Sequence, residues 1–328
     1  MISYFALKTA VLILIGLCVF LVGLLTMRHG LTQATSQKME RVITRLVKTP
    51  TRGLLTGMIA TLFTQSSAAV TIISMGLVAA NVLKFTDTIG IILGTNIGST
   101  FTVGLLSLNI ARFGPYIILA GVILYLLGIS RKHAPIFTWR VKSLAIGLVG
   151  FGTLFVGFHL MSTATAPLAS SQTFIRWLLL ARVHPIIGLF AGTIITALIG
   201  SSSASTALTL SLAQSGALSL LGATAIVFGN NIGTCTTALL ASIGGTRPVQ
   251  RVAVTHVFLN VAGATVFMLF IHPFTAWIEW MTKDIGTQVA LAHFLFNVIS
   301  SLLALPFVTQ LVWLLEKILP DRREFPVA

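Results

Sequence analysis

Long apolar stretches separated by short polar segments are the feature that most constrains this chain. Five of them approach or exceed the roughly 20 apolar residues that a helix needs to cross a bilayer: 9–27, 114–129, 141–161, 252–271 and 289–315. Asp, Glu, Lys and Arg make up 9 % of the 328 residues, against roughly 25 % in soluble proteins. The chain therefore cannot cover a water-facing surface, which excludes a soluble enzyme and indicates an all-α polytopic membrane protein.

The net charge of +14 does not indicate nucleic-acid binding, because the 21 Lys and Arg lie between the apolar stretches. Basic loops on the cytoplasmic side of a membrane give the same balance. We therefore expect the lipid bilayer, and no nucleic acid, as the partner of this surface. An apolar outer face would also permit a homodimer.

Two further apolar regions, 53–108 and 186–243, are cut by polar residues into pieces of about a dozen residues. The cuts fall at 65–67 and 94–100 in the first region, and at 200–203 and 229–234 in the second. Pieces of this length are too short for simple spans and are typical of re-entrant hairpins and discontinuous helices. We predict re-entrant hairpins over 53–80 and 186–215, and broken helices over 85–108 and 218–243.

These two regions align with each other at a constant offset of 135 residues, without a gap. The pair Ser66-Ser67 matches Ser201-Ser202, and Asn96-Ile97-Gly98 matches Asn231-Ile232-Gly233. Chance similarity would match Leu and Ala, and would not repeat these polar residues at one spacing. The same offset also matches Thr61, Thr71 and Thr102 with Thr196, Thr206 and Thr237. We therefore predict two repeats, 9–129 and 141–272, and an additional transmembrane helix over 289–315.

Counting the expected crossings gives the two repeats opposite orientations, because their hairpins then enter the membrane from different sides. Inverted repeats of this kind are common in secondary transporters. On this count 16 of the 21 Lys and Arg lie on one side of the membrane and 5 on the other. The side with 16 is the cytoplasmic side by the positive-inside rule. We expect seven crossings and two hairpins in the plasma membrane, with the N-terminus outside and the C-terminus in the cytoplasm.

The broken regions contain almost no charge, so their buried polar groups are hydroxyls, amides and backbone. No Asp, Glu, Lys or Arg occurs from 183 to 246, and two charged residues, Lys84 and Asp87, occur from 53 to 111. Free N–H groups at the start of a half-helix attract an anion. The predicted anion ligands are accordingly Ser66, Ser67, Ser201, Ser202, Ser203, Asn96 and Asn231.

Carbonyl and hydroxyl oxygens at a helix break can also coordinate a hard cation such as Na⁺. The candidate sodium ligands are Gln65, Thr71, Thr95, Ser99, Thr206, Asn230 and Thr234. No Arg or Lys is expected at the breaks, so Na⁺ would supply the positive charge that balances the anion. No other metal and no cofactor is expected.

Two histidines recur in apolar stretches within the frame Ala-x-x-His-x-x-x-Asn. His256 is followed by Asn260, and His293 by Asn297. A buried His usually makes a structural hydrogen bond, and that interpretation is favoured here. The recurrence of the frame leaves open a shared supporting role for these four residues, such as holding a hairpin.

At these serine motifs, Asn-Ile-Gly segments and histidine frames, the sequence resembles the type II sodium–phosphate cotransporter family over about residues 9–315. The resemblance implies symport of inorganic phosphate with Na⁺ as coupling ion, bound between the hairpin tips of a bacterial cytoplasmic-membrane protein. The family motif is Gln-Ser-Ser-Ser in both repeats. This chain instead has Ala68 at the end of the first motif and Gly200 at the start of the second, so each half has one side-chain ligand fewer.

The predicted function is that of a secondary active transporter, a sodium-coupled phosphate symporter that works by alternating access, and not an enzyme. A Na⁺-coupled transporter of another oxyanion or a carboxylate, and a passive anion channel, remain open as alternatives. An intramembrane serine hydrolase that uses a clustered Ser with His256 or His293 is disfavoured. The sequence has no Gly-x-Ser-x-Gly elbow, and two symmetric Ser clusters are not what a single nucleophile needs.

Overall fold

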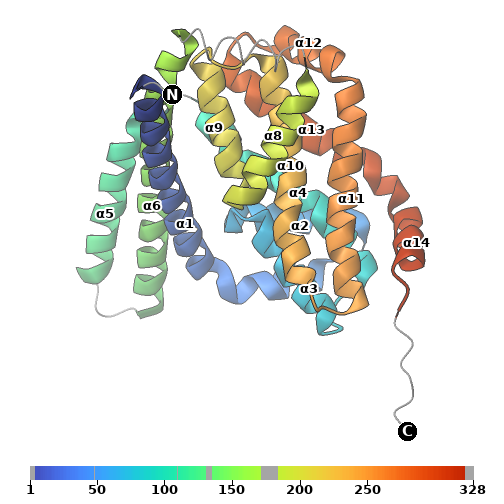
Figure 1. Cartoon of the computed structure of the whole chain (residues 1–328). Coiled ribbons are helices and arrows are strands. Elements are labelled where there is room, and N and C mark those ends of the chain that lie inside the picture. Colours follow the sequence, from blue (N-terminus) through green and yellow to red (C-terminus); the bar gives the residue numbers. More distant parts are fainter. Residues whose placement is uncertain (1–3, 48, 109, 131–134, 171–183, 322–328) are drawn as a thin grey trace.

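The computed structural model describes residues 4–47, 49–108, 110–130, 135–170 and 184–321, and every regular element within them is a helix (Figure 1). In chain order the α-helices are α1 (Tyr4–Leu46), α2 (Pro50–Thr64), α3 (Ser67–Ala79), α4 (Phe85–Ser107), α5 (Gly114–Ser130), α6 (Pro135–Thr165), α8 (Pro185–Ile199), α9 (Ser202–Gln214), α10 (Leu220–Ser242), α11 (Arg247–Leu269), α12 (Ile271–Met281), α13 (Ile285–Ala304) and α14 (Val308–Ile318). Three short 3₁₀ helices connect some of them: η1 (Ile110–Phe113), η2 (Ala166–Ser170) and η3 (Leu305–Phe307).

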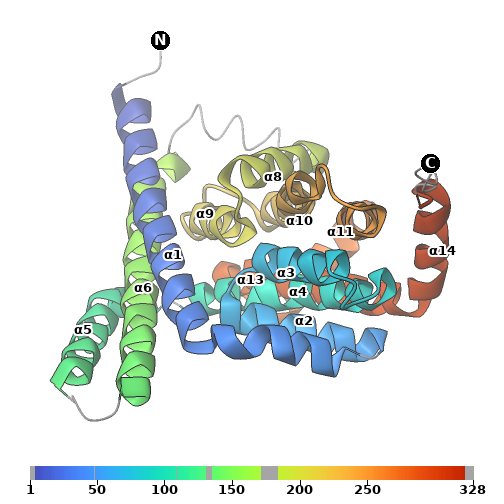
Figure 2. The same ribbon diagram turned by 90° about the horizontal axis from the view of Figure 1, so that it is seen from below.

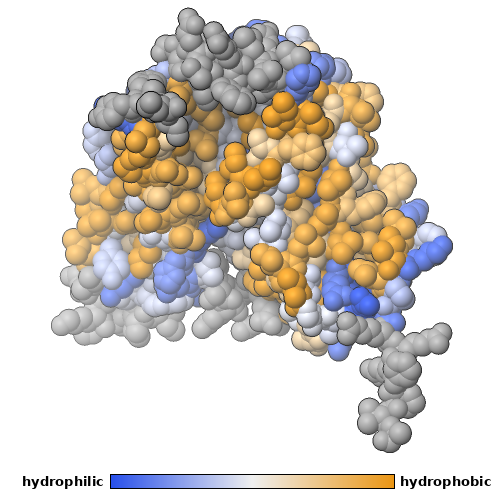
Figure 3. Space-filling view, in the orientation of Figure 1, coloured by the Kyte–Doolittle hydropathy of each residue, from blue (hydrophilic) through white to orange (hydrophobic). Residues whose placement is uncertain are grey.

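Six segments of the described chain are long and apolar enough to cross a membrane: Leu7–Ala34, Phe85–Ser107, Ile110–Gly128, Thr138–Leu168, Arg247–Leu269 and Ile285–Ile318. The face of the molecule in Figure 3 is largely hydrophobic, with hydrophilic residues gathered toward its upper and lower edges. These findings confirm an all-helical, multi-pass membrane protein. They give one span fewer than the seven predicted, because α10 is not among the six segments.

The helices form two groups, which meet where the end of α1 leads into α2 and where α6 contacts α9. The first group is α1, α5 and α6, in which α6 packs along both other helices. Seen from below, the second group has two layers, with α8, α9, α10 and α11 in one and α2, α3, α4 and α13 in the other (Figure 2). The closest helix pairs of this group are α2 with α4 and α8 with α10.

The repeat detected in the sequence is also present in the backbone. Helices α2, α3 and α4 have 15, 13 and 23 residues, and α8, α9 and α10 have the same lengths in the same order. Their first residues, 50, 67 and 85 against 185, 202 and 220, keep the offset of 135. The two regions predicted as hairpins, 53–80 and 186–215, are each two short helices separated by a break at the serine motif.

The breaks predicted inside 85–108 and 218–243 are wrong, because α4 and α10 are continuous helices. Their hydroxyls bond back to their own helix, as Thr95 Oγ1 does to the Ile92 carbonyl at 2.8 Å, so these residues leave the helical backbone bonds intact. The glycines serve packing instead. A Cβ atom on Gly94 would overlap the Leu54 carbonyl of α2, and close approach of this kind is why small residues line membrane helix contacts.

The additional helix predicted over 289–315 is also different in the structure. It is interrupted by the 3₁₀ segment η3, which separates α13 from α14. Pro306 lies in this segment, and proline has no N–H to continue the helical hydrogen bonds. At the other end of the chain, α1 runs without interruption from Tyr4 to Leu46 and so continues well beyond the predicted span 9–27.

Candidate functional site

The two helix breaks have the same backbone geometry. Gln65 and Gly200 follow α2 and α8 in the left-handed conformation, with φ of 52° and 71°. Ser66 and Ser201 come next, both at φ −148°, and cap α3 and α9. The Oγ of each accepts a hydrogen bond from the N–H three residues on, at 3.1 and 3.4 Å. Each break therefore starts a helix whose other terminal N–H groups and dipole favour an anion.

Three of the predicted anion ligands have hydroxyls that are not used within the described part of the protein. Ser67, Ser202 and Ser203 lie in the first turn of α3 or α9 and are 8 %, 7 % and 5 % exposed. No hydrogen bond of their side chains occurs among the described residues, whereas the caps Ser66 and Ser201 already accept one. The hydroxyls of buried residues are normally paired, so these three are the best placed to donate to a ligand.

The serine-bearing helices pack crosswise between the two repeats. Helix α3 contacts α10, and α9 contacts α4, so each serine motif belongs to a helix that lies against an asparagine-bearing helix of the other repeat. The asparagines themselves are occupied in this structure. Asn96 Nδ2 donates to Asn260 Oδ1 at 2.9 Å, and Asn231 Nδ2 donates to the Val227 carbonyl at 3.1 Å.

Gln65 joins three helices at the first break. Its Oε1 accepts a hydrogen bond from Thr102 Oγ1 of α4, and its Nε2 donates to the Leu62 carbonyl of α2 at 2.6 Å. Its backbone carbonyl accepts a hydrogen bond from Arg28 Nε of α1 at 2.7 Å. The expectation that no Arg or Lys lies at the breaks is therefore wrong. A guanidinium from the Leu7–Ala34 segment reaches the peptide group that joins Gln65 to Ser66.

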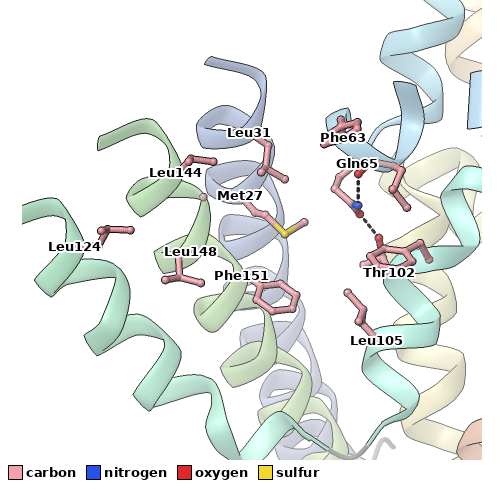
Figure 4. Close-up of a pocket in the computed structure, with 13 residues that line it drawn as sticks. Met27, Leu31, Phe63, Gln65, Thr102, Leu105, Leu124, Leu144, Leu148 and Phe151 are labelled. Atoms are coloured by element: carbon pink, nitrogen blue, oxygen red, sulfur yellow. Dashed lines mark hydrogen bonds between the residues drawn. The ribbon is translucent and has the colours of Figure 1, made fainter. Parts of the chain in front are cut away.

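A cavity of about 460 Å³ lies beside Gln65, between the group of α1, α5 and α6 and the helices α2 and α4 (Figure 4). Met27, Leu144 and Phe151 line one wall, and the side chains of Gln65 and Thr102 lie opposite them (Figure 4). The other walls are also largely apolar. Such walls would not replace the water around an oxyanion, so this cavity separates two helix groups and is not the anion site.

At the second break a buried amide connects α8, α9 and α10. Asn230 is fully buried and forms hydrogen bonds with Thr196, Ser205 and Thr206 at 3.0, 2.8 and 2.9 Å. The contacts are best satisfied when the amide nitrogen faces Thr196, Ser205 and two backbone carbonyls, and the oxygen faces Thr206. Thr234 Oγ1 donates to the Asn230 carbonyl at 2.8 Å. Two predicted sodium ligands of the second repeat, Asn230 and Thr206, therefore meet, whereas the Thr234 hydroxyl bonds back to its own helix.

The first repeat has no such amide at the equivalent position, where Thr95 replaces Asn230. Thr61 and Thr71 match Thr196 and Thr206, and their buried hydroxyls have no hydrogen-bond partner among the described residues. The remaining two sodium candidates of this repeat are engaged elsewhere. Ser99 Oγ donates to a carbonyl of its own helix at 2.8 Å, and Gln65 lies at the break itself.

The histidine frames do not make one shared contact. His256 and His293 are fully buried, and within the described chain neither ring has a hydrogen-bond partner, so the favoured structural hydrogen bond is not found. Asn297 Nδ2 donates to the carbonyl of His293 at 2.8 Å. Asn260 instead accepts from Asn96 and donates to the sulfur of Cys235 at 3.1 Å, which links α4, α10 and α11.

Several residues of these networks were not predicted as site residues. Thr61, Thr102 and Thr196 carried a usable signal, because each repeats with a second threonine at the offset of 135. The others have no counterpart of the same type in the aligned repeats: Arg28, Ser205 and Cys235.

Taken together, fold and site define a polytopic membrane protein with a duplicated helix–break–helix unit, whose breaks are lined by buried hydroxyls and reached by one guanidinium. Sequence comparison gives its family. The description of the Na⁺/Pi-cotransporter family matches the chain twice, over residues 19–163 and 164–304, and the chain belongs to that family. Each match contains one of the two serine motifs.

Curated relatives fall into two groups of different length. "Uncharacterized protein YqeW" of Bacillus subtilis (strain 168) is 30 % identical over 92 % of this chain and 96 % of its own length. "Putative inorganic phosphate export protein YjbB" of Escherichia coli (strain K12) and of Salmonella typhimurium (strain LT2) is 24 % identical in each case, over 90 % of this chain. The chain spans 53 % of the length of these YjbB proteins. No solved structure matches the chain.

Proposed function

We propose that this protein is a secondary active transporter that moves inorganic phosphate together with Na⁺ across the bacterial cytoplasmic membrane. The observation that carries the proposal is the pair of equivalent serine-capped breaks, each on a helix that packs against the other repeat. Family membership and the phosphate named for the YjbB relatives support the choice of substrate. The helix starts at the breaks and the unused hydroxyls of Ser67, Ser202 and Ser203 would replace the water around the phosphate oxygens.

In this proposal the two repeats have opposite orientations, and their serine motifs are the tips of re-entrant hairpins that meet near the membrane midplane. The equal helix lengths and the crosswise packing support this arrangement. The group of α1, α5 and α6 would remain as a scaffold while the hairpin-bearing group moves, since an apolar cavity separates the two. Each half would then open the site to one side, as alternating access requires.

Substrate competition tests the choice of anion. Purified protein in proteoliposomes should take up labelled phosphate under an inward Na⁺ gradient, and a large excess of unlabelled phosphate should suppress the signal. Sulfate and a dicarboxylate should leave it intact. Suppression by either of these anions at the same concentration as phosphate would assign the site to a broader anion class. Uptake that does not depend on Na⁺ would indicate a passive channel.

The first repeat supplies the best candidate for a sodium site. In the second repeat, the buried amide nitrogen of Asn230 donates to Thr196 and Ser205. Thr95 has no amide group, and the hydroxyls of Thr61 and Thr71, which match Thr196 and Thr206, have no donor or acceptor among the described residues. A Na⁺ ion at this position would be coordinated by neutral oxygens, as hard cations prefer. The amide of the second repeat would then occupy the place that the cation takes in the first.

Removing one of these hydroxyls should weaken sodium binding without unfolding the protein. We expect Thr71→Val, which keeps the side-chain shape, to raise the Na⁺ concentration for half-maximal uptake by about tenfold, equivalent to roughly 1.4 kcal/mol. The matched control is Thr88→Val, because Thr88 is fully buried and its Oγ1 donates within its own helix at 2.6 Å. Equal sodium dependence in both variants and the wild type would remove Thr71 from the site.

A further inference from the structure

We propose that Arg28 supplies a fixed positive charge to the anion site at the first break, and that this charge, together with Na⁺, holds the transported oxyanion. The inference rests on the proposed function and deepens it, because it names the side chain that neutralises part of the substrate's charge. It also makes the two breaks unequal, with the charge on the first alone.

The geometry leaves the guanidinium available to a ligand. Arg28 Nε donates to the Gln65 carbonyl at 2.7 Å, which fixes the plane of the group beside the peptide bond that leads into Ser66. No hydrogen bond of its two terminal nitrogens occurs among the described residues. Paired N–H groups on a planar guanidinium match the oxygens of an oxyanion, and the first turn of α3 starts at the same peptide group.

The electrostatic surroundings indicate an anionic ligand. Arg28 is partly buried within the Leu7–Ala34 segment, where an unpaired charge is costly. It has no carboxylate partner in the described chain, in which the ion pair found is Arg251 with Asp321 at 3.0 Å. Asp87, the acidic residue of the segment from 53 to 111, accepts a hydrogen bond from the backbone N–H of Lys84 at 3.1 Å, where α4 begins. A bound oxyanion would supply the missing countercharge.

Among the described residues, no Lys or Arg side chain forms a hydrogen bond at the second break as Arg28 does at the first. The helices that precede the two breaks also resemble each other, at an offset of 134: Val22, Gly23 and Met27 match Val156, Gly157 and Met161, so Arg28 corresponds to Ser162. Gly200 likewise stands where the first break has Gln65. The region from 183 to 246 contains no charged residue at all. Within the described part of the chain the guanidinium lies at the first break, so the anion should lie toward α3.

Charge and hydrogen bonding at this position can be separated by two substitutions. Arg28→Gln keeps a donor for the Gln65 carbonyl but removes the charge, whereas Arg28→Lys keeps both. We expect Arg28→Gln to raise the phosphate concentration for half-maximal uptake at least about tenfold. Arg28→Lys, which keeps the charge but loses the paired N–H groups, should raise it by clearly less. Arg112→Gln, which removes an exposed arginine of η1, should match the wild type. Equal values for Arg28→Gln and Arg28→Lys would overturn the inference.

A second measurement, on the wild-type protein, covers the case in which Arg28→Gln does not fold. Phenylglyoxal modifies arginine, and bound phosphate should slow the modification of Arg28 at least about tenfold, as followed by mass spectrometry, while that of Arg112 stays unchanged. Absence of protection would overturn the role of Arg28.

The wild type separates the two proposals. If it transports no anion in proteoliposomes, the proposed function fails and Arg28 with it; if it transports phosphate but Arg28 is not protected, the inference on Arg28 alone fails.

Discussion

Ser202→Ala is expected to reduce phosphate uptake by about 10- to 100-fold while the protein remains folded. Ser202 is a buried residue and its hydroxyl makes no hydrogen bond among the described residues, so its removal breaks no hydrogen bond of the native state. It does remove a donor to a charged ligand, which is worth about 1.5–3 kcal/mol. Initial uptake rates in proteoliposomes measure the loss, and the melting temperature in detergent measures folding. Ser67→Ala should behave in the same way at the first break.

Other serines of the same helices provide controls for this result. Ser74 of α3 is buried and its Oγ donates to the Val70 carbonyl at 2.8 Å, so Ser74→Ala should leave uptake close to that of the wild type. Ser201→Ala removes a helix cap and should cost about 1 kcal/mol of stability. Uptake by Ser202→Ala at the wild-type rate would exclude this hydroxyl as a phosphate ligand.

Gln65→Gly is expected to lower uptake at least about tenfold, equivalent to roughly 1.4 kcal/mol, with little change in stability. A non-glycine residue in the left-handed conformation costs about 1–2 kcal/mol, and glycine relieves this cost. The substitution also removes the side-chain hydrogen bonds to Thr102 and Leu62, worth about 0.5–1.5 kcal/mol each, so gain and loss offset each other. Gly200 reaches the same backbone geometry without a side chain, so the variant tests the Gln65 side chain alone.

Asn81 provides the matched control, because it is the other described non-glycine residue with positive φ, at 55°, and is exposed near the end of α3. Asn81→Gly should relieve similar strain and leave uptake unchanged. If Gln65→Gly transports as well as Asn81→Gly, the Gln65 side chain has no role in transport, and its hydrogen bonds only stabilise the break.

The sequence was sufficient to locate the breaks, because a serine that caps a helix and the residue before it are local features that recur at a fixed offset. Ser66 and Ser201 cap the helices that this pattern indicates. The glycine-rich segments were interpreted wrongly, because their role depends on a neighbouring helix and not on the local sequence. Whether Gly94 breaks a helix or admits a neighbour depends on the Leu54 carbonyl of α2, which the local sequence does not reveal.

The polar networks were less predictable than the breaks. Arg28 is one of the 16 Lys and Arg residues that the sequence places on the cytoplasmic side, because it directly follows the apolar stretch 9–27. Its contact with Gln65 depends on how α1 packs beside α2. The contrast between Thr95 and Asn230 was visible as a difference between the repeats. Its consequence could not be predicted, because it depends on how three helices pack together. Among the described residues, two hydroxyls of the first repeat have no partner, whereas the amide of the second repeat is satisfied.

The most direct test of the central claim is labelled phosphate uptake into proteoliposomes with and without an inward Na⁺ gradient, at a constant membrane potential. Coupling requires that phosphate accumulates inside above its external concentration when Na⁺ is high outside and choline replaces it inside. Accumulation should collapse when Na⁺ is equal on both sides. Phosphate that only equilibrates, at the same rate under both conditions, would contradict sodium-coupled transport.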